Sequence, residues 1–178
     1  MIGLLRADAG RVSLLGTDVT TLREPVWVPL RRRCGMVFQG AALFDSLSVL
    51  ENVAYPLRQH ERWPDSRVRE RVGACLEAVG LPGVEAMLPA ELSGGMRKRV
   101  GVARAIALEP ELVLYDEPTT GLDPANARRI AELILALNER LHVTSVVVTH
   151  DLDLCFAVSD RLALLKSGRI AACGNVDE

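Results

Sequence analysis

The second half of the chain alternates short apolar runs with helix-like segments, and this alternation constrains the fold more than any other feature. The runs Leu112–Tyr115 and Ser145–Thr149 have the length and β-branched content of buried strands. Between them, Asp123 suits the N-cap and Pro124 the first turn of a helix that extends to about Leu141. Strands separated by crossover helices predict an α/β fold with a mainly parallel sheet covered on both faces.

The rest of the chain divides into regions that differ in predicted secondary structure. Residues 1–40 are predicted to form short strands and turns, whereas residues 41–108 are predicted to be helical. We therefore expect one domain over residues 1–178, with an α/β core from residues 1–40 and 109–178 and a helical subdomain between them. The other predicted elements are strands at 11–16, 34–39, 161–165 and 169–173 and a turn at 167–168. Three more helices are predicted: one capped by Asp65 or Ser66 that stops at Gly80, one that begins at Ser93, and one near 152–158.

Composition excludes several classes of protein. With 178 residues, 49% of them hydrophobic and 25% charged, the chain can bury one sizeable core. A net charge of −2 and an aromatic content of 4% give no support for nucleic-acid binding. No apolar run approaches the ~18 residues of a membrane-spanning helix. The four cysteines lack Cys-x-x-Cys spacing, which predicts reduced, mostly buried residues of a cytosolic protein.

Polar residues follow the predicted strands at the ends where ligands bind in open α/β sheets. Asp116 and Glu117 come directly after one strand, and His150 ends the next. Adjacent carboxylates can hold Mg²⁺ and orient an attacking water, although solvated acids at a strand end are the alternative. An imidazole there can donate to a phosphate, although a lone His is more often structural. Gln39, also at a strand end, could ligate Mg²⁺ through its amide oxygen.

A second candidate site opens the helix that starts at Ser93. Gly94 and Gly95 would let a ligand approach the backbone, and the free N–H groups at the helix start attract phosphate. An ordinary serine-capped helix with a flexible turn is the alternative interpretation.

Taken together and in order, these segments resemble the ATP-binding subunit of an ABC transporter. Within that family, Phe38–Leu47 and Ser93–Val100 are similar to the Mla-type, Mce-associated lipid transport ATPases. The resemblance covers essentially the whole chain. The matching motifs are Val37-Phe-Gln39 (Q-loop), Leu92-Ser-Gly-Gly-Met96 (signature loop), Leu112-Val-Leu-Tyr-Asp-Glu117 (Walker B), Gly121-Leu-Asp123 (D-loop) and Val148-Thr-His150 (switch histidine).

The resemblance implies a P-loop NTPase fold and specific roles for site residues. Asp116 would hold Mg²⁺ with the help of Gln39, Glu117 would act on the hydrolytic water, and His150 would contact the γ-phosphate of ATP. Two subunits would face head to tail, with each signature loop completing the nucleotide site of the other subunit. The loop residues are Ser93, Gly94 and Gly95, and Asp123 would help connect the two sites.

The resemblance also implies partners and a location. The segment Leu43–Tyr55 would dock against a membrane permease, which would place the chain in the cytoplasm on the inner face of the cell membrane. A Mce-type lipid-binding protein is a further expected partner, and the expected function is ATP-driven transport of phospholipid or another lipid. The alternatives are an ABC ATPase that serves another substrate and a non-catalytic ABC partner module.

One departure from the family is large. The family carries a Walker A loop, Gly-x-x-x-x-Gly-Lys-Ser/Thr, but the only two lysines here, Lys98 and Lys166, belong to no such loop. We therefore expect a truncated chain without the N-terminal strands and the P-loop. Such a chain should bind ATP weakly, hydrolyse it negligibly on its own, and leave a sheet edge and apolar surface uncovered.

Overall fold

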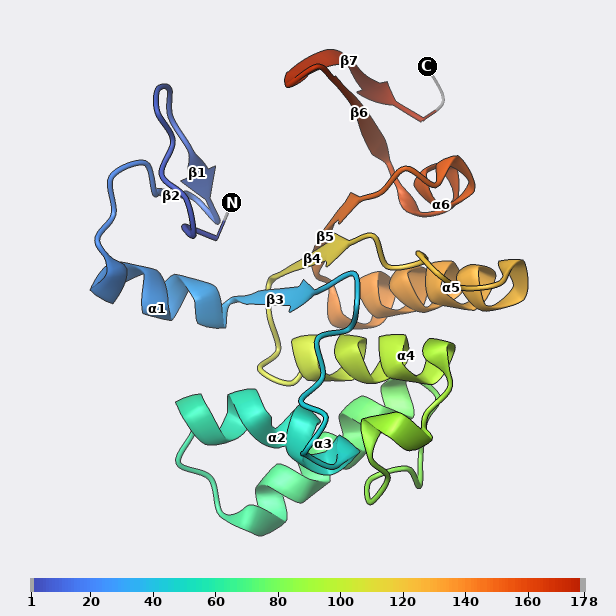
Figure 1. Ribbon diagram of the computed structural model, residues 1–178. Coiled ribbons are helices and arrows are strands. Elements are labelled where there is room, and N and C mark those ends of the chain that lie inside the picture. The colour runs from blue at the N-terminus through green and yellow to red at the C-terminus, as the bar shows by residue number, and fades with distance from the viewer. Residues whose placement is uncertain (1, 177–178) are drawn as a thin grey trace.

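A three-stranded parallel sheet lies at the centre of the computed structural model, which describes residues 2–176 (Figure 1). Its strands are β3 (Cys34–Val37), β4 (Leu112–Asp116) and β5 (Thr144–Val148), in the order β3-β4-β5. The register pairs Val37 with Tyr115 and Asp116 with Val148, so the carboxyl ends of the three strands lie at one edge. The parallel arrangement predicted from the alternation is confirmed.

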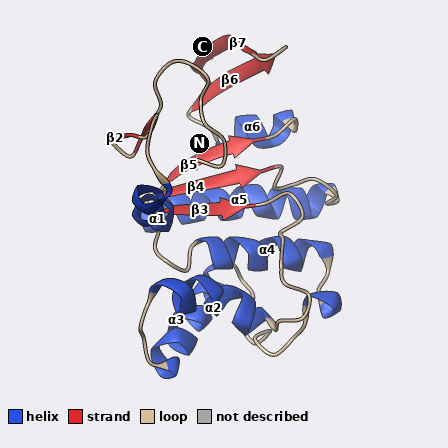
Figure 2. Ribbon diagram, turned by 60° about the vertical axis from the view of Figure 1, so that its left-hand side comes forward, coloured by secondary structure: helices blue, strands red, loops and turns tan. Residues whose placement is uncertain are grey.

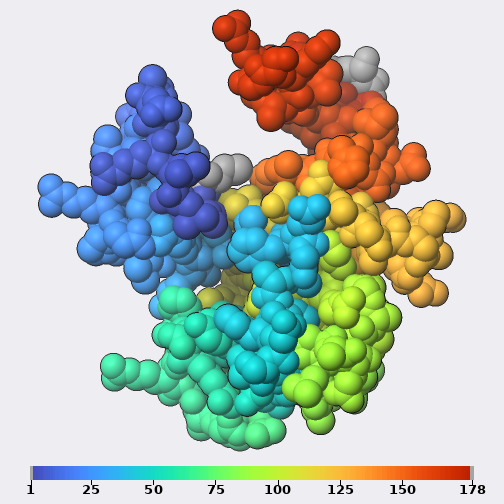
Figure 3. All heavy atoms as spheres, in the orientation of Figure 1, coloured from blue at the N-terminus to red at the C-terminus, as the bar shows by residue number. Residues whose placement is uncertain are grey.

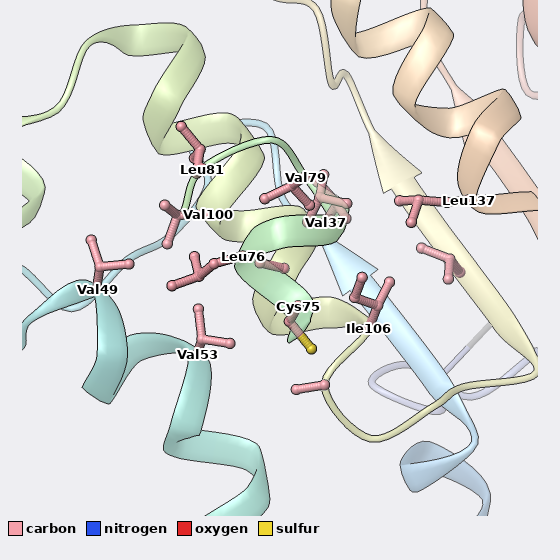
Figure 4. Close-up of a cluster of buried hydrophobic side chains, with 14 of the residues drawn as sticks. Val37, Val49, Val53, Cys75, Leu76, Val79, Leu81, Val100, Ile106 and Leu137 are labelled. Atoms are coloured by element: carbon pink, nitrogen blue, oxygen red, sulfur yellow. The ribbon is translucent and has the colours of Figure 1, made fainter. Parts of the chain in front are cut away.

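Four helices cover one face of the sheet in two layers: α2 (Val49–His60), α3 (Asp65–Ala78), α4 (Gly94–Ala105) and α5 (Pro124–Leu141). Figure 2 shows α4 and α5 along the sheet, with α2 and α3 beyond α4. A single apolar cluster runs from β3 and β4 through all four helices, as Figure 4 shows for its central side chains. The helical layer therefore shares its core with the sheet, and the division at residues 41 and 108 stays a prediction.

The opposite face is covered by the N-terminal segment. Leu112 and Leu114, which alternate along β4 with residues of the larger cluster, contact a smaller apolar cluster here. That cluster includes Trp27 and Leu30 of helix α1 (Glu24–Arg32) and Leu14 of strand β1 (Ser13–Leu14). Coverage of this face ends before the carboxyl end of β5, where the side chain of Val148 is 60% exposed.

Two predictions for residues 1–40 are wrong. Only short strands and turns are expected here, but residues 24–32 form helix α1, in which Pro25 occupies the first turn, where proline is tolerated. The strand expected over residues 11–16 is only two residues long. Leu15 and Gly16 have φ of 48° and 77°, so they form a tight turn to strand β2 (Thr17–Asp18) instead of extending the strand.

The remaining helix ends follow the sequence closely, with one exception. Gly80 has a φ of 66°, the left-handed conformation expected where α3 stops. At the start of α3, however, the N-cap is Pro64, and neither Asp65 nor Ser66 caps the helix. A short 3₁₀ turn, η1 (Pro89–Glu91), leads into the segment before α4, and α6 (Leu152–Val158) has the predicted bounds.

The C-terminal strands form a separate antiparallel hairpin and do not join the parallel sheet. They are β6 (Arg161–Lys166) and β7 (Arg169–Asn175), joined at Ser167 and Gly168 as predicted. In Figure 3 this hairpin (red) lies at the top of the molecule, apart from the N-terminal segment (blue). Among the described residues, β5 pairs only with β4, so its other edge is open, as expected.

Two further expectations can be compared with the structure. The four cysteines are free, but only Cys75 is buried, and Cys173 is exposed, so the expectation of mostly buried cysteines is wrong. No helix within residues 2–176 is both long and apolar enough to cross a membrane.

Candidate functional site

The parallel register brings the predicted catalytic residues to one edge of the sheet. Asp116 is the last residue of β4, and Glu117 follows it. His150 lies two residues beyond β5, and Gln39 lies two residues beyond β3. The amide N–H of Glu117 donates to the carbonyl of Val148 at 2.9 Å, which fastens the end of β4 to the end of β5.

Glu117 and His150 contact each other directly. Nδ1 of His150 lies 2.8 Å from Oε1 of Glu117, and the His150 amide N–H donates to the same oxygen at 3.2 Å. The hydroxyls of Thr120 and Thr149 each donate to Oε2 at 3.1 Å. The side chain of Glu117 is 20% exposed and that of His150 is 81% exposed, so the imidazole can move into solvent while the carboxylate stays held.

This contact sets the ionisation of both groups. The hydrogen bond from His150 is the largest cause that lowers the pKa of Glu117 below its ordinary 4.5, with Thr120 and Thr149 adding to it. The same bond, followed by the charge of Glu117, raises the pKa of His150 above its ordinary 6.5. Glu117 is therefore ionised at neutral pH and able to accept a hydrogen bond from water.

A strained backbone conformation at Glu117 places its carboxylate beside Thr149 and His150. Glu117 has a φ of 47°, a left-handed conformation that is uncommon for residues other than glycine. The turn carries the side chain from the end of β4 across to the residues after β5. Strained backbone of this kind clusters at functional sites, although it does not by itself identify one.

Asp116 and Gln39 offer oxygen atoms that suit Mg²⁺. Asp116 is half-buried, and its carboxylate has no hydrogen-bond or ion-pair partner among residues 2–176, whereas Gln39 is exposed. The described part of the chain holds no group of three or more metal-ligating His, Cys, Asp or Glu residues. Mg²⁺ commonly takes only one or two protein oxygens and keeps water or phosphate as its other ligands, so this donor pair fits that ion.

The segment Ser93–Gly95 begins helix α4 as the sequence predicts. The Ser93 hydroxyl oxygen accepts from the amide N–H of Met96 at 3.2 Å, and both Ser93 and Gly94 are exposed. Gly95 is buried, and a Cβ there would lie 3.1 Å from the amide oxygen of Asn126 on α5. Gly95 thus allows α4 to approach α5 closely, a reason for this glycine that its sequence pattern did not reveal.

Asp123 joins this contact from the other side. Its carboxylate accepts from the amide N–H groups of Ala125 and Asn126, both at 3.0 Å, and from the side-chain amide of Asn126. Asn126 therefore links the capping residue of α5 to Gly95. No hydrogen bond or ion pair among the described residues connects Ser93–Gly95 to Glu117 or His150.

Sequence reasoning missed three side chains that support the site. Thr120 and Thr149 bind the Glu117 carboxylate, and the Lys98 ammonium binds the backbone carbonyls of Gln39 and Glu117. Thr149 belongs to a motif that the sequence reasoning singled out, but nothing in the sequence gave it a partner. The partners of Lys98 are 59 and 19 residues away, so no local pattern could reveal them.

Comparisons with known proteins place these residues in a family context. A family model described as "ABC transporter" matches residues 1–120. The chain is 41% identical to the intermembrane phospholipid transport system ATP-binding protein MlaF of Haemophilus influenzae, over 99% of this chain and 67% of that protein. It is 44% identical to the methionine import ATP-binding protein MetN 2 of Rhodococcus jostii, over 98% of this chain and 51% of that protein. The chain thus spans between about half and two thirds of the length of these relatives.

A solved structure gives the same assignment of the fold. A dimeric, post-hydrolysis structure of the ATP-binding cassette MJ0796 bound to ADP and Pi matches with a TM-score of 0.87 and 33% identity. The match covers 97% of this chain and 76% of that chain. The expected P-loop NTPase fold is confirmed.

Proposed function

Since this chain belongs to the ABC transporter family, we propose that it acts as the ATP-binding and ATP-hydrolysing subunit of a transporter that moves phospholipid or another lipid. The observation that carries the catalytic part is the 2.8 Å contact between Glu117 and His150 beside Asp116, at the carboxyl ends of neighbouring parallel strands. The observation that favours lipid as cargo is the identity with the phospholipid transport protein MlaF.

The geometry supports distinct roles for the two contacting residues. The ionised carboxylate of Glu117, held by two threonine hydroxyls, would accept a hydrogen bond from the attacking water. The exposed imidazole of His150 would turn from Glu117 to donate to the γ-phosphate. The bound Mg²⁺–ATP supplies the phosphoanhydride bond that is broken, with Asp116 and Gln39 as the residues that would hold the metal ion.

A second copy of the chain would contribute the signature loop. Ser93 caps α4, whose free N–H groups and dipole favour an anion at that end. Because no hydrogen bond or ion pair connects this loop to Glu117 or His150 among the described residues, we propose that it serves the nucleotide of a partner subunit in a head-to-tail dimer. Asp123, bonded to Asn126 beside Gly95, would help connect the two sites.

An apolar pocket of about 460 Å³ supports docking of a permease. It lies against β3, α2 and α4, and its walls include Met36, Phe44, Tyr55 and Arg104. The ring centroids of Phe44 and Tyr55 lie 4.8 Å apart, and both residues are partly exposed. We propose that a helix of the permease inserts an apolar side chain here, which would place the chain at the inner face of the cell membrane.

The loop that forms this pocket is rigidly held. Asn52, which is fully buried, accepts from the amide N–H of Phe44 at 2.8 Å and donates to the carbonyls of Phe44 and Leu47 at 3.1 and 3.0 Å. A preformed pocket loses little conformational entropy when a partner binds. A Mce-type lipid-binding protein would complete the transport system.

Two alternatives have specific support. Identity with the methionine import protein MetN 2 is of similar size, so a cargo other than lipid is the alternative for the substrate. A non-catalytic partner module is the alternative for the activity, since the 178 residues contain no Gly-x-x-x-x-Gly-Lys-Ser/Thr loop to surround the phosphates.

Calorimetry and an ATPase assay test the catalytic proposal. For the 178-residue chain alone we expect binding of Mg²⁺–ATP weaker than about 1 μM and negligible turnover, because a Walker A loop supplies most phosphate contacts. A dissociation constant at or below about 1 μM together with normal turnover would contradict this expectation. Any turnover that is measured should be lost in Glu117→Gln, and turnover that survives this substitution would refute the role of Glu117.

Co-purification with the transmembrane permease of the same transport system tests the docking surface. We expect Phe44→Asp to abolish the complex, because it places a charge in the apolar pocket. Leu135→Asp on α5, where Leu135 is also partly exposed, is the matched control and should leave the complex intact. Equal complex formation by both variants would place the permease elsewhere.

A further inference from the structure

Lys98 is a buried cation on α4, beside the carboxyl ends of β3 and β4. Only 7% of the residue is exposed, although lysine is among the residues least often buried. It belongs to α4, one turn after the signature loop, and nothing in the proposed mechanism uses it. Burial lowers the pKa of Lys98 from its ordinary value of 10.5, while the charge of Glu117 opposes that change.

The Lys98 ammonium joins two segments that carry proposed site residues. It donates to the backbone carbonyl of Gln39, after β3, and to the backbone carbonyl of Glu117, after β4, the latter at 3.3 Å. Glu117 is also the residue with the strained φ of 47°. A single side chain thus bonds the peptide groups that set the direction of both the Gln39 amide and the Glu117 carboxylate.

The same face of α4 holds the residues that follow Gln39. Gly101, three positions after Lys98, leaves room for Ala41, whose Cβ would lie 3.2 Å from a Cβ on Gly101. Arg104, three positions further, donates to the carbonyls of Ala41 and Ala42, both at 2.7 Å. Residues three apart are neighbours on a helix surface, and the contacts of Lys98, Gly101 and Arg104 hold residues 39–42 along α4.

We propose that Lys98 is a positioning residue for the ATPase site: its ammonium holds the carbonyls of Gln39 and Glu117 so that their side chains keep one arrangement relative to α4. The proposal rests on the proposed function for its consequence, but its geometry does not. A movement of α4 or of residues 39–42 would reach both site residues through this one group. Arg104 binds the carbonyls of Ala41 and Ala42, and Lys98 binds that of Glu117.

Packing alone does not account for a lysine here. A methionine of similar length would fill the space without removing a charge from water, and replacing buried charge by well-packed apolar groups is often neutral or stabilising. The energetic effect of Lys98 therefore comes through the two carbonyls that it binds. Without the ammonium, both carbonyls lose a charge-assisted partner in a half-buried site.

Hydrogen exchange measured by mass spectrometry tests the proposal in the full chain without nucleotide. We expect Lys98→Met to raise exchange at least tenfold in peptides that cover residues 38–44 and 117–121, while peptides from α3 and α5 stay at wild-type rates. Lys98→Arg, which keeps a cation with several donors, should restore most of the protection. The control is Lys166→Met. Lys166 is the only other lysine and is exposed, so its loss should change exchange in neither residues 38–44 nor residues 117–121.

The imidazole of His150 gives a second readout that a purely structural role would not move. If Lys98 holds Glu117, its loss should weaken the contact with His150, and the imidazole resonance in Lys98→Met should titrate about 0.5 pH units lower than in the wild type. Lys98→Arg should titrate close to the wild type. Unchanged His150 titration with uniformly raised exchange in Lys98→Met would overturn the proposal and leave Lys98 as a core residue.

Two precautions keep the outcome decisive. If Lys98→Met does not fold, the same measurements on Lys98→Gln, whose amide can donate to one carbonyl only, decide the question. If Lys98→Gln exchanges faster than the wild type in residues 38–44 and 117–121 and its His150 imidazole titrates lower, the proposal is supported. Wild-type values in both readouts refute it. Neither readout needs ATP, so a negative calorimetric result would count against the proposed function and not against this inference.

Discussion

At the scale of single residues, the site depends on one carboxylate that several groups hold. Glu117 accepts hydrogen bonds from two threonine hydroxyls and from two nitrogens of His150, and its backbone is strained to reach them. This arrangement lowers the pKa of Glu117 and raises that of His150. The residue types and their order were evident from the sequence, but the direct contact between them was not.

The substitution Glu117→Gln should lower the pKa of His150. The hydrogen bond and charge of Glu117 are the two largest causes that raise this pKa above 6.5, so removing the charge should return it toward that value, with Asp151 retaining a small effect. Titration of the imidazole protons by NMR measures the change, with His60 and His142 as internal controls. An unchanged His150 titration would show that the contact does not form in solution.

The contact also contributes stability over a defined pH range. The raised pKa of His150 gives a contribution that is complete below 6.5 and lost as pH rises through the folded-state value. The lowered pKa of Glu117 gives one that is complete above 4.5 and lost as pH falls through its folded-state value. Both are present together between pH 4.5 and 6.5, and since His150 is exposed, salt should weaken them.

At the scale of secondary-structure elements, local signals predicted the helices whose N-cap side chain binds an amide N–H of the first turn. The bounds of α5 agree with the sequence because Asp123 and Pro124 act within the first turn, and α6 begins after Asp151, whose carboxylate accepts from the Leu154 amide. Local signals failed at α1, where only short strands and turns are expected, and at the N-cap of α3, which is Pro64. These elements depend on tertiary burial, as the buried Trp27 of α1 shows.

The two glycines that open α4 should respond differently to substitution. Gly95→Ala should destabilise the fold by about 1–3 kcal/mol, because its Cβ would press on the Asn126 amide where α4 meets α5. Gly94→Ala should be neutral or stabilise by up to about 1 kcal/mol, because a Cβ there meets only Leu122 at 3.8 Å. Urea unfolding of both variants measures the difference. Equal effects would mean that the close contact between the helices is absent.

At the scale of the whole molecule, the strands within residues 2–176 form three separate sheets, and there the second edge of β5 is open. Large apolar side chains are exposed around this edge and on the C-terminal hairpin, at Val148, Leu152, Phe156, Leu164, Leu165 and Ile170. An open edge beside exposed apolar residues favours association between chains. The body formed by α2–α5 and the parallel sheet, in contrast, shares one buried core.

We expect the chain to self-associate with rising concentration and to bind a hydrophobic dye. The double substitution Leu165→Lys and Ile170→Lys should reduce both, because it places charges on the hairpin. Sedimentation velocity over a range of concentrations and dye fluorescence measure these properties. A monomer at all concentrations that binds no dye would contradict this expectation.

The sequence by itself determined the α/β class, the parallel pairing of the strands that carry the motifs, and the helices whose caps lie within one turn, because these depend on periodicity and on neighbouring residues. Only the tertiary structure decided which residues contact each other: Glu117 with His150, Gly95 with Asn126, and Lys98 with the backbone carbonyls of Gln39 and Glu117. Such contacts join residues far apart in the chain. They form only when packing fixes the distance between elements, and no local pattern records that distance.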